Sequence, residues 1–231
     1  MLPTPPNPSR TLVMACATVI EEMLPLMPPG MQHQVFDFGL HINPDKLRRA
    51  LQEAVDAVSG QFETIILGYG MCSQAIIGIK ANGCRLVVPR VDDCITIFLG
   101  SRGAYAAQCQ AEPGTYYLTK GWIEVGDTPF TDYDFSVQRY GKERAEMIYK
   151  MMMGNYRRLA LINTGQYELE KYREYTRRTA ERFGLRFEEI EGSDALIRKM
   201  LFGPWDEDFV VLAPGETFRI QQFYNFEEGA A

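Results

Sequence analysis

The chain lacks an excess of basic residues. Its 231 residues include 24 lysines and arginines against 30 aspartates and glutamates, which gives a net charge of −6 at pH 7. Binding to nucleic-acid phosphates calls for a basic face. The nearest candidate, the Arg-rich segment 172–182, alternates with glutamate as a solvated helix face does. We therefore expect no nucleic-acid partner.

The sequence also lacks long apolar runs and a recognisable leader. No run approaches the roughly 18 apolar residues that cross a membrane, and the start, MLPTPPNPSR, has no charged segment followed by an apolar one. These absences predict a cytoplasmic protein without a membrane partner. Disulfides rarely persist in the cytoplasm, so the five cysteines are expected to be packed, metal-bound or reactive rather than paired.

What the sequence does contain is an alternation of short β-branched apolar runs with helical segments. Runs typical of buried strands are followed by helix starts, of which Asn43 before Pro44 is the clearest, because asparagine caps helices and proline fits their first position. This order predicts a parallel sheet covered on both sides. Strands are expected at 11–16, 34–40, 63–70 and 84–90, with helices at 18–26, 44–58, 73–83 and 92–99.

The second half of the chain shows a similar order. Strands are expected at 156–165, 185–191 and 208–216, and helices at 136–153, 168–183 and 193–202. The predicted fold class is therefore α/β, with two Rossmann-like lobes, mainly parallel sheets and a pseudo-repeat that rests on element order alone. The predicted division is a disordered tail at 1–10, an N-terminal lobe at 11–113, a connecting strand, loop and helix at 114–157, and a C-terminal lobe at 158–231.

Three of the cysteines follow predicted strands. Cys16 ends LVMAC, Cys72 follows ILGYGM, and Cys94 follows VVPRVDD. Open α/β sheets bind ligands outside the carboxyl ends of their strands, so these thiols could converge on one pocket. Each could instead be a small packed residue, since cysteine is among the most buried residue types. Cys84 and Cys109 do not follow strands and are interpreted as structural.

The chemistry of a three-thiol site leaves three alternatives open. Three thiolates could hold an iron–sulfur cluster of the 4Fe-4S type with one iron open to a substrate. Zinc could be held by the same cysteines and His41, one of only two histidines. Cys94 could also act as a free nucleophile, because the helix start predicted after Asp93 would stabilise a thiolate.

Three further residues are expected to contact the bound group. Tyr69 and Gly70 belong to the GYG turn before Cys72, where glycine permits close backbone approach. Arg90 stands near Cys94 and could bind an anionic substrate or pair with a neighbouring aspartate. The aromatic residues of segment 114–130 could be core or could wall a cleft between the lobes.

The stretch LGYGMCSQAIIGIKANGCRLVVPRVDDCITIFLGS, with GLHINPDKL before it and PGTYYLTKGWIE after it, resembles the prokaryotic family called domain of unknown function 1638. The resemblance runs from Cys16 to the segment WDEDFVVLAPGE. Genes of that family often stand beside those for corrinoid-dependent methyltransferases, so the resemblance implies a role in one-carbon metabolism. It implies no particular reaction. The positions that match the family's signature blocks are Cys16, His41, Cys72, Arg90, Asp93 and Cys94.

Two functions remain from these observations. The first is a metal-binding protein, with an iron–sulfur cluster favoured over zinc, that serves corrinoid methyl transfer and whose open metal position could act on a small-molecule substrate. The second is a non-catalytic accessory protein that binds a corrinoid protein or a methyltransferase. A packed fold in which the thiols hold nothing is the simplest alternative to both.

Overall fold

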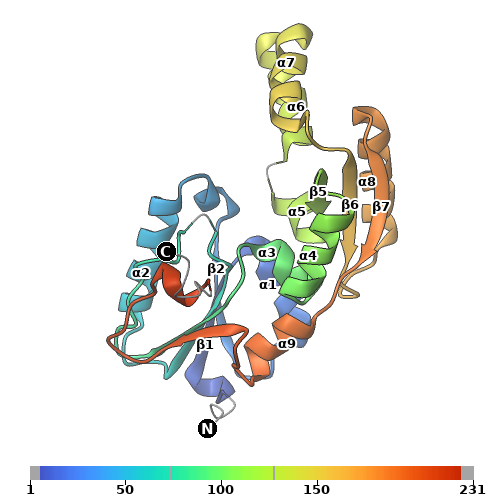
Figure 1. Cartoon of the computed structure of the whole chain (residues 1–231). Helices are drawn as coiled ribbons and strands as arrows, with labels where there is room; N and C mark the ends of the chain where they lie inside the picture. Colours follow the sequence, from blue (N-terminus) through green and yellow to red (C-terminus); the bar gives the residue numbers. More distant parts are fainter. Residues whose placement is uncertain (1–5, 73, 127, 225–231) are drawn as a thin grey trace, which may run out of the picture.

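The computed structural model describes residues 6–72, 74–126 and 128–224. It is a mixed α/β structure with two sheets, each the centre of one lobe (Figure 1). Of the tail predicted to be disordered at 1–10, residues 1–5 lie outside the described part of the chain. Pro8–Arg10 form a 3-10 helix that the Asn7 side chain caps through the backbone N–H of Ser9.

The first lobe is built on a five-stranded sheet of order β2-β1-β3-β4-β8. The first four of these strands are parallel, as the sequence predicts, and β8 runs antiparallel to β4. All residues of β1 and β3 are buried, which is why both read as continuous apolar runs rather than alternating ones. The strands are β1 (Thr11–Cys16), β2 (Gln32–Phe36), β3 (Thr64–Gly68), β4 (Arg85–Pro89) and β8 (Phe209–Leu212).

The helices of this lobe begin where their capping residues stand. The Asn43 side chain accepts a hydrogen bond from the backbone N–H of Lys46, and Pro44 opens the helix, which confirms the predicted start. Asp93 caps helix α3 (Cys94–Leu99) in the same way, because its side chain accepts hydrogen bonds from backbone N–H groups of the first helical turn. The helices are α1 (Ala17–Met23), α2 (Pro44–Ala57), α3 (Cys94–Leu99), α4 (Arg102–Ala111) and α9 (Ala195–Phe202), with 3-10 turns η2 (Leu24–Leu26), η3 (Phe38–Ile42) and η4 (Ile220–Gln222).

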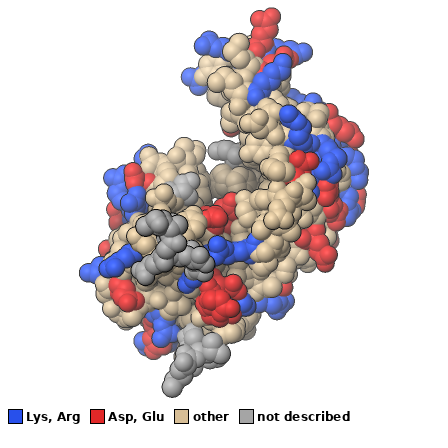
Figure 2. Space-filling model, viewed as in Figure 1, with Lys and Arg blue, Asp and Glu red and all other residues tan. Residues whose placement is uncertain are grey.

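The second lobe carries a parallel three-stranded sheet of order β5-β6-β7. Helices α6 and α7 form a hairpin that projects from the rest of the molecule (Figure 1 and, in space-filling form, Figure 2). The hairpin exposes large apolar side chains, among them Phe135, Met147 and Met151. The elements are β5 (Thr115–Leu118), α5 (Lys120–Val125), α6 (Pro129–Tyr140), α7 (Lys142–Met153), β6 (Arg158–Asn163), α8 (Glu170–Phe183) and β7 (Arg186–Glu191).

Three expected elements differ in the structure. The pseudo-repeat places the last strand and the helix before it in the second lobe, but both belong to the first. Strand β8 pairs with β4, and α9 packs against β3, β4 and α3. The helix expected at 136–153 is two helices, because Gly141 adopts a φ of 81° that a continuous helix excludes. The described part of segment 73–83 forms turns and one isolated bridge rather than a helix.

The two lobes meet where α1 packs against α5. Gly121 makes this approach close, since a Cβ atom there would lie 2.8 Å from the Thr18 Cα atom. An ion pair joins the same helices, with 2.8 Å between Lys120 Nζ and Glu21 Oε2. Among the described residues, no helix combines the length and apolar character required of a membrane span.

Candidate functional site

The carboxyl ends of three neighbouring strands carry the three predicted cysteines. Cys16 is the last residue of β1, Cys72 lies in the loop after β3, and Cys94 opens α3 after β4. These strands are adjacent and parallel, so their carboxyl ends meet at the same edge of the sheet. The topology therefore brings the three positions to one side of the first lobe.

The three thiols influence one another's ionisation. Burial raises the pKa of Cys94 well above its ordinary value, and negative charge on Cys16 or Cys72 would raise it further. Burial is also the main cause of the raised pKa of Cys72, followed by the charge of Cys16. Charges act in this way only on close neighbours. Cys16 is buried, Cys72 and Cys94 are half-buried at the cavity beside it, and each thiol is neutral at neutral pH.

The pKa of Cys94 is raised in the structure, so the start of α3 does not by itself favour the thiolate form. Asp93 does cap α3, with its Oδ1 accepting from the backbone N–H groups of Ile95 and Thr96 at 3.0 and 3.3 Å. Helix α3 has only six residues, however, and the low-dielectric surroundings of Cys94, its first residue, disfavour a charge. The cost of moving a charge out of water exceeds the stabilisation that one short helix end supplies.

The loop that carries Cys72 is held to the start of α3 by two backbone bonds. Met71 N–H donates to the Val91 carbonyl at 2.8 Å, and Cys72 N–H donates to the Asp92 carbonyl at 2.9 Å. Cys72 itself has a φ of 45°, in the left-handed region that side chains other than glycine rarely adopt. Backbone strain of this kind persists where the surrounding structure enforces it, and it concentrates at functional sites.

The thiols are close without forming a ready coordination shell. Within residues 6–72, 74–126 and 128–224, no three Cys, His, Asp or Glu side chains are grouped as metal ligands are. Cys16 Sγ lies 3.0 Å from Thr18 Oγ1 and so has a polar neighbour of its own. That the three cysteines act as metal ligands thus stays a prediction. Their side chains would have to rearrange on binding the metal.

His41 lies at the same edge, in the 3-10 turn η3 rather than at the end of a strand. Its ring stacks on Tyr69 and Phe38, with centroid separations of 5.8 and 5.4 Å. Burial lowers its pKa, so the imidazole is neutral. Nδ1 lies 3.1 Å from the Phe38 carbonyl oxygen, which can only accept, so Nδ1 carries the proton and Nε2 keeps its lone pair.

The three residues expected to contact a bound group differ in their surroundings. Tyr69 is 1% exposed, its hydroxyl has no partner among the described residues, and its pKa is raised by burial and then by Cys16 and Cys72. Gly70 packs against the protein itself: a Cβ atom there would lie 2.6 Å from the Asp93 nitrogen.

Arg90 lies apart from the thiols in the structure. Its Nη2 is 3.5 Å from the Phe209 carbonyl oxygen, and its backbone N–H donates to the Asp208 carbonyl. It is absent from the residues that line the cavity beside the thiols. The expectation that it contacts a ligand because it precedes Cys94 is therefore not supported by its position, since the chain turns toward β8 at this point.

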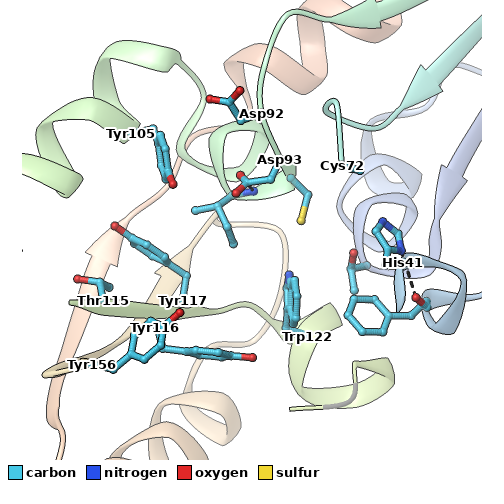
Figure 3. A pocket seen from close by; sticks show the side chains of 14 residues that line it. His41, Cys72, Asp92, Asp93, Tyr105, Thr115, Tyr116, Tyr117, Trp122 and Tyr156 are labelled. Atoms are coloured by element: carbon cyan, nitrogen blue, oxygen red, sulfur yellow. Dashed lines mark hydrogen bonds between the residues drawn. The ribbon is translucent and has the colours of Figure 1, made fainter. Parts of the chain in front are cut away.

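A cavity of about 440 Å³ opens between the lobes beside the thiols (Figure 3). The first lobe contributes residues around Cys72 and Cys94 together with Tyr105 of α4, and the second lobe contributes the other rings of an aromatic wall. Trp122 stands between the two parts, with its ring edge-on to Phe38 at a centroid distance of 4.8 Å. Its Nε1 is buried without a hydrogen-bond partner among the described residues, yet it lies close enough to Cys94 to lower the pKa of that thiol. The aromatic wall consists of Tyr105, Tyr116, Tyr117 and Tyr156.

Sequence reasoning identified part of this wall and missed the rest. Tyr116, Tyr117 and Trp122 were expected either in the core or in a cleft, and the structure places them in the lining. Tyr105 and Tyr156 carry no local signal, because one lies on α4 and the other in the turn before β6. Only the packing of the two lobes brings them to the same cavity.

Glu22 is a buried carboxyl group that joins the lobes near this cavity. Thr164 Oγ1, from the loop after β6, donates to Glu22 Oε2 at 2.5 Å, while Oε1 has no partner among the described residues. Burial raises the pKa of Glu22 above its ordinary value of 4.5, although the hydrogen bond from Thr164 lowers it. The group is thus held in surroundings that favour its protonated form.

This raised pKa predicts a pH-dependent stability. A carboxyl group whose pKa is higher in the folded state contributes its full stability below 4.5, and the contribution is lost as the pH rises through the folded value. We expect the free energy of unfolding of the native protein to fall, relative to that of Glu22→Gln, as the pH rises above 4.5. Glutamine retains an oxygen that can accept from Thr164. Urea unfolding over roughly pH 4 to 8 measures the difference, and two parallel curves would contradict it.

Comparison with known proteins gives one match. A family model described as Protein of unknown function (DUF1638) matches residues 35–201, which include His41, Cys72 and Cys94 and leave Cys16 outside the matched range. No curated protein and no solved structure matches the chain.

Proposed function

The chain belongs to the DUF1638 family, and from this membership and the buried thiols we propose that it is a metal-binding protein of corrinoid-dependent one-carbon metabolism. The proposal assigns Cys16, Cys72 and Cys94 as the ligands of an iron–sulfur cluster. The metabolic setting is the one that the family resemblance implies. A cytoplasmic location, where thiols stay reduced, is part of the proposal.

The observation that supports this assignment is the mutual effect of the three thiols on their pKa values. The side chains come from three adjacent strand ends, and charge on Cys16 would raise the pKa of Cys72 while charge on Cys16 or Cys72 would raise that of Cys94. A soft metal centre reverses this, because its positive charge makes coordinated thiols ionise outright. Ionised thiols grouped in this way would destabilise the folded protein without a metal, whereas thiolates bound to a metal would stabilise it.

Two orphaned hydrogen-bond donors fit the same interpretation. The Tyr69 hydroxyl and the Trp122 Nε1 are buried without partners among the described residues, and both lie beside the thiols. Sulfur atoms that bear negative charge accept hydrogen bonds, and such bonds tune the reduction potential of a cluster. The apolar strands behind the cysteines would keep water away from the bound group.

A cluster held by three cysteines leaves one iron open, which would supply Lewis-acid or redox chemistry to a small-molecule substrate. The protein's own residues supply the rest. The aromatic wall, Trp122 and the thiols of Cys72 and Cys94 line the same cavity, so a ligand held there would lie beside the proposed centre (Figure 3). His41, neutral and stacked on Tyr69, fixes the edge of the site opposite the wall.

Zinc is the second candidate, and the tautomer of His41 favours it. Because Nδ1 donates to the Phe38 carbonyl, the Nε2 lone pair is available to a metal, as in many zinc sites where the other nitrogen is fixed by a carbonyl. A closed zinc site would need this histidine as its fourth ligand. A three-cysteine cluster would assemble without it.

The deciding experiment compares the native protein with His41→Ala, both purified without oxygen. Iron, acid-labile sulfide and zinc are measured, together with the visible absorption spectrum. We expect both proteins to carry iron and sulfide and to absorb broadly in the visible range. Stoichiometric zinc in the native protein that is lost from His41→Ala would instead establish the Cys₃His site. A native protein with neither metal would overturn the proposal.

A further inference from the structure

The cavity is larger than a metal centre needs, and much of its lining cannot bind a metal. Four tyrosines and a tryptophan contribute ring surface, and pairs of them meet edge-on or tilted rather than closing over one another. Tyr116 and Tyr156 stand 5.6 Å apart between ring centroids, and Tyr105 and Tyr117 stand 6.4 Å apart. Figure 3 shows these rings around a space that Asp93 also faces. A cavity of about 440 Å³ is within the range that small ligands occupy.

The charge in this cavity is of one sign. Asp92 and Asp93 are among its described lining residues, His41 is neutral, and none of that lining is lysine or arginine. Asp92 accepts a hydrogen bond from the Tyr224 hydroxyl at 2.9 Å, and Asp93 accepts from two backbone N–H groups. These donors are neutral, and no basic side chain among the described lining residues offsets either carboxylate, while burial raises the pKa of Asp93 above its ordinary value of 3.8.

We propose that the aromatic wall and the two aspartates form a binding site for a small organic ammonium cation. Ring faces carry negative charge density and attract ammonium groups, above all those that bear alkyl substituents in place of N–H donors. Carboxylates without a basic partner attract the same charge, and they repel carboxylate or phosphate ligands. A neutral aromatic ligand would gain from the rings but would leave both aspartates uncompensated.

This site adjoins the proposed metal centre but rests on different side chains. It rests on the rings and Asp93, whereas the metal proposal rests on the three thiols, of which Cys72 and Cys94 also line the cavity (Figure 3). Cys16 belongs to the thiols and does not line the cavity. The two proposals can therefore fail separately.

Two probes of the same shape test the proposal. Choline carries a trimethylammonium group, and 3,3-dimethylbutan-1-ol is its uncharged counterpart with a tert-butyl group. Titration calorimetry on the purified protein is expected to show binding of choline that is at least tenfold tighter than binding of the alcohol. Equal affinities, or no choline binding, would overturn the proposal.

Matched variants locate the site. Asp93→Asn keeps the cap of α3, because asparagine caps as well as aspartate does, but it removes the charge, and we expect choline affinity to fall at least tenfold. Tyr117→Leu should weaken binding similarly, while Tyr117→Phe, which keeps the ring, should restore it. Tyr140→Leu, on the exposed hairpin, is the control. Undiminished binding in both Asp93→Asn and Tyr117→Leu would refute the site.

A last variant separates this proposal from the metal centre. Cys16→Ala is expected to lose the metal and to keep its affinity for choline, because Cys16 does not line the cavity. Loss of choline binding together with the metal would show that the cation site depends on the centre and would contradict a site that rests on different side chains.

Discussion

Cys94→Ala is expected to reduce the iron and sulfide content of the anaerobically purified protein at least tenfold. Charge on either of the other two thiols would raise the pKa of Cys94, so it lies close to Cys16 and to Cys72. The substitution would remove one of the three proposed protein ligands of the cluster. Metal analysis and visible absorption measure the loss.

The matched control is Cys84→Ala. Cys84 is also buried, at 1% exposed, but it precedes β4 and so lies at the opposite end of the sheet. Its pKa is raised to about 11 by burial and then by Asp56, and none of the three candidate ligands contributes. The control should keep its metal. Equal metal content in the two variants would remove Cys94 from the site.

Gly70→Ala is expected to destabilise the protein by about 1–3 kcal/mol, the usual cost of forcing extra volume into a packed site. The new Cβ atom would lie 2.6 Å from the Asp93 nitrogen and 2.7 Å from its Cα. Both are backbone atoms that cannot rotate away, so the loop of Cys72 and the start of α3 must separate. Chemical denaturation measures the stability, and we expect the metal content to fall with it.

The same substitution at Gly103 provides the comparison. Gly103 lies within α4, and a Cβ atom there would meet only Ser101 Oγ, at 3.9 Å. Alanine at a compatible helical position stabilises by about 0.4–1 kcal/mol, because it restricts the unfolded chain. A loss of stability in Gly70→Ala together with a gain in Gly103→Ala would locate the destabilisation at the contact with Asp93. Equal stabilities would refute the tight approach.

Local chemistry explains which parts of the fold the sequence predicts. The capped start at Asn43, the helix after Asp93 and the parallel order of the first strands were all predicted from neighbouring residues, and the structure confirms them. The pairing of β8 with β4 could not be predicted in this way, because the residues of a short apolar strand do not specify which strand it pairs with. The break at Gly141 was missed because the apolar pattern continues across it.

In the candidate site, too, some residues could be predicted from local sequence and others could not. The placement of Cys16, Cys72 and Cys94 at adjacent strand ends could be predicted, because strand ends in a parallel sheet share one edge, while their role as ligands stays a prediction. Tyr105 and Tyr156 could not, since they meet the thiols only through contacts between the lobes. Arg90 shows the converse: its position in the sequence beside Cys94 suggested the site, but its guanidinium lies against the backbone of β8.

The return of β8 to the first sheet has a consequence for synthesis of the chain. The strands β1 to β4 leave the ribosome first, followed by the whole second lobe, and β8 comes last. Until then the outer edge of β4 has no partner, and an unpaired strand edge invites pairing with other chains. The second lobe must therefore be made, and can fold, while the first is still incomplete. Nascent chains that stop short of Phe209 would be the form of this protein most prone to aggregate.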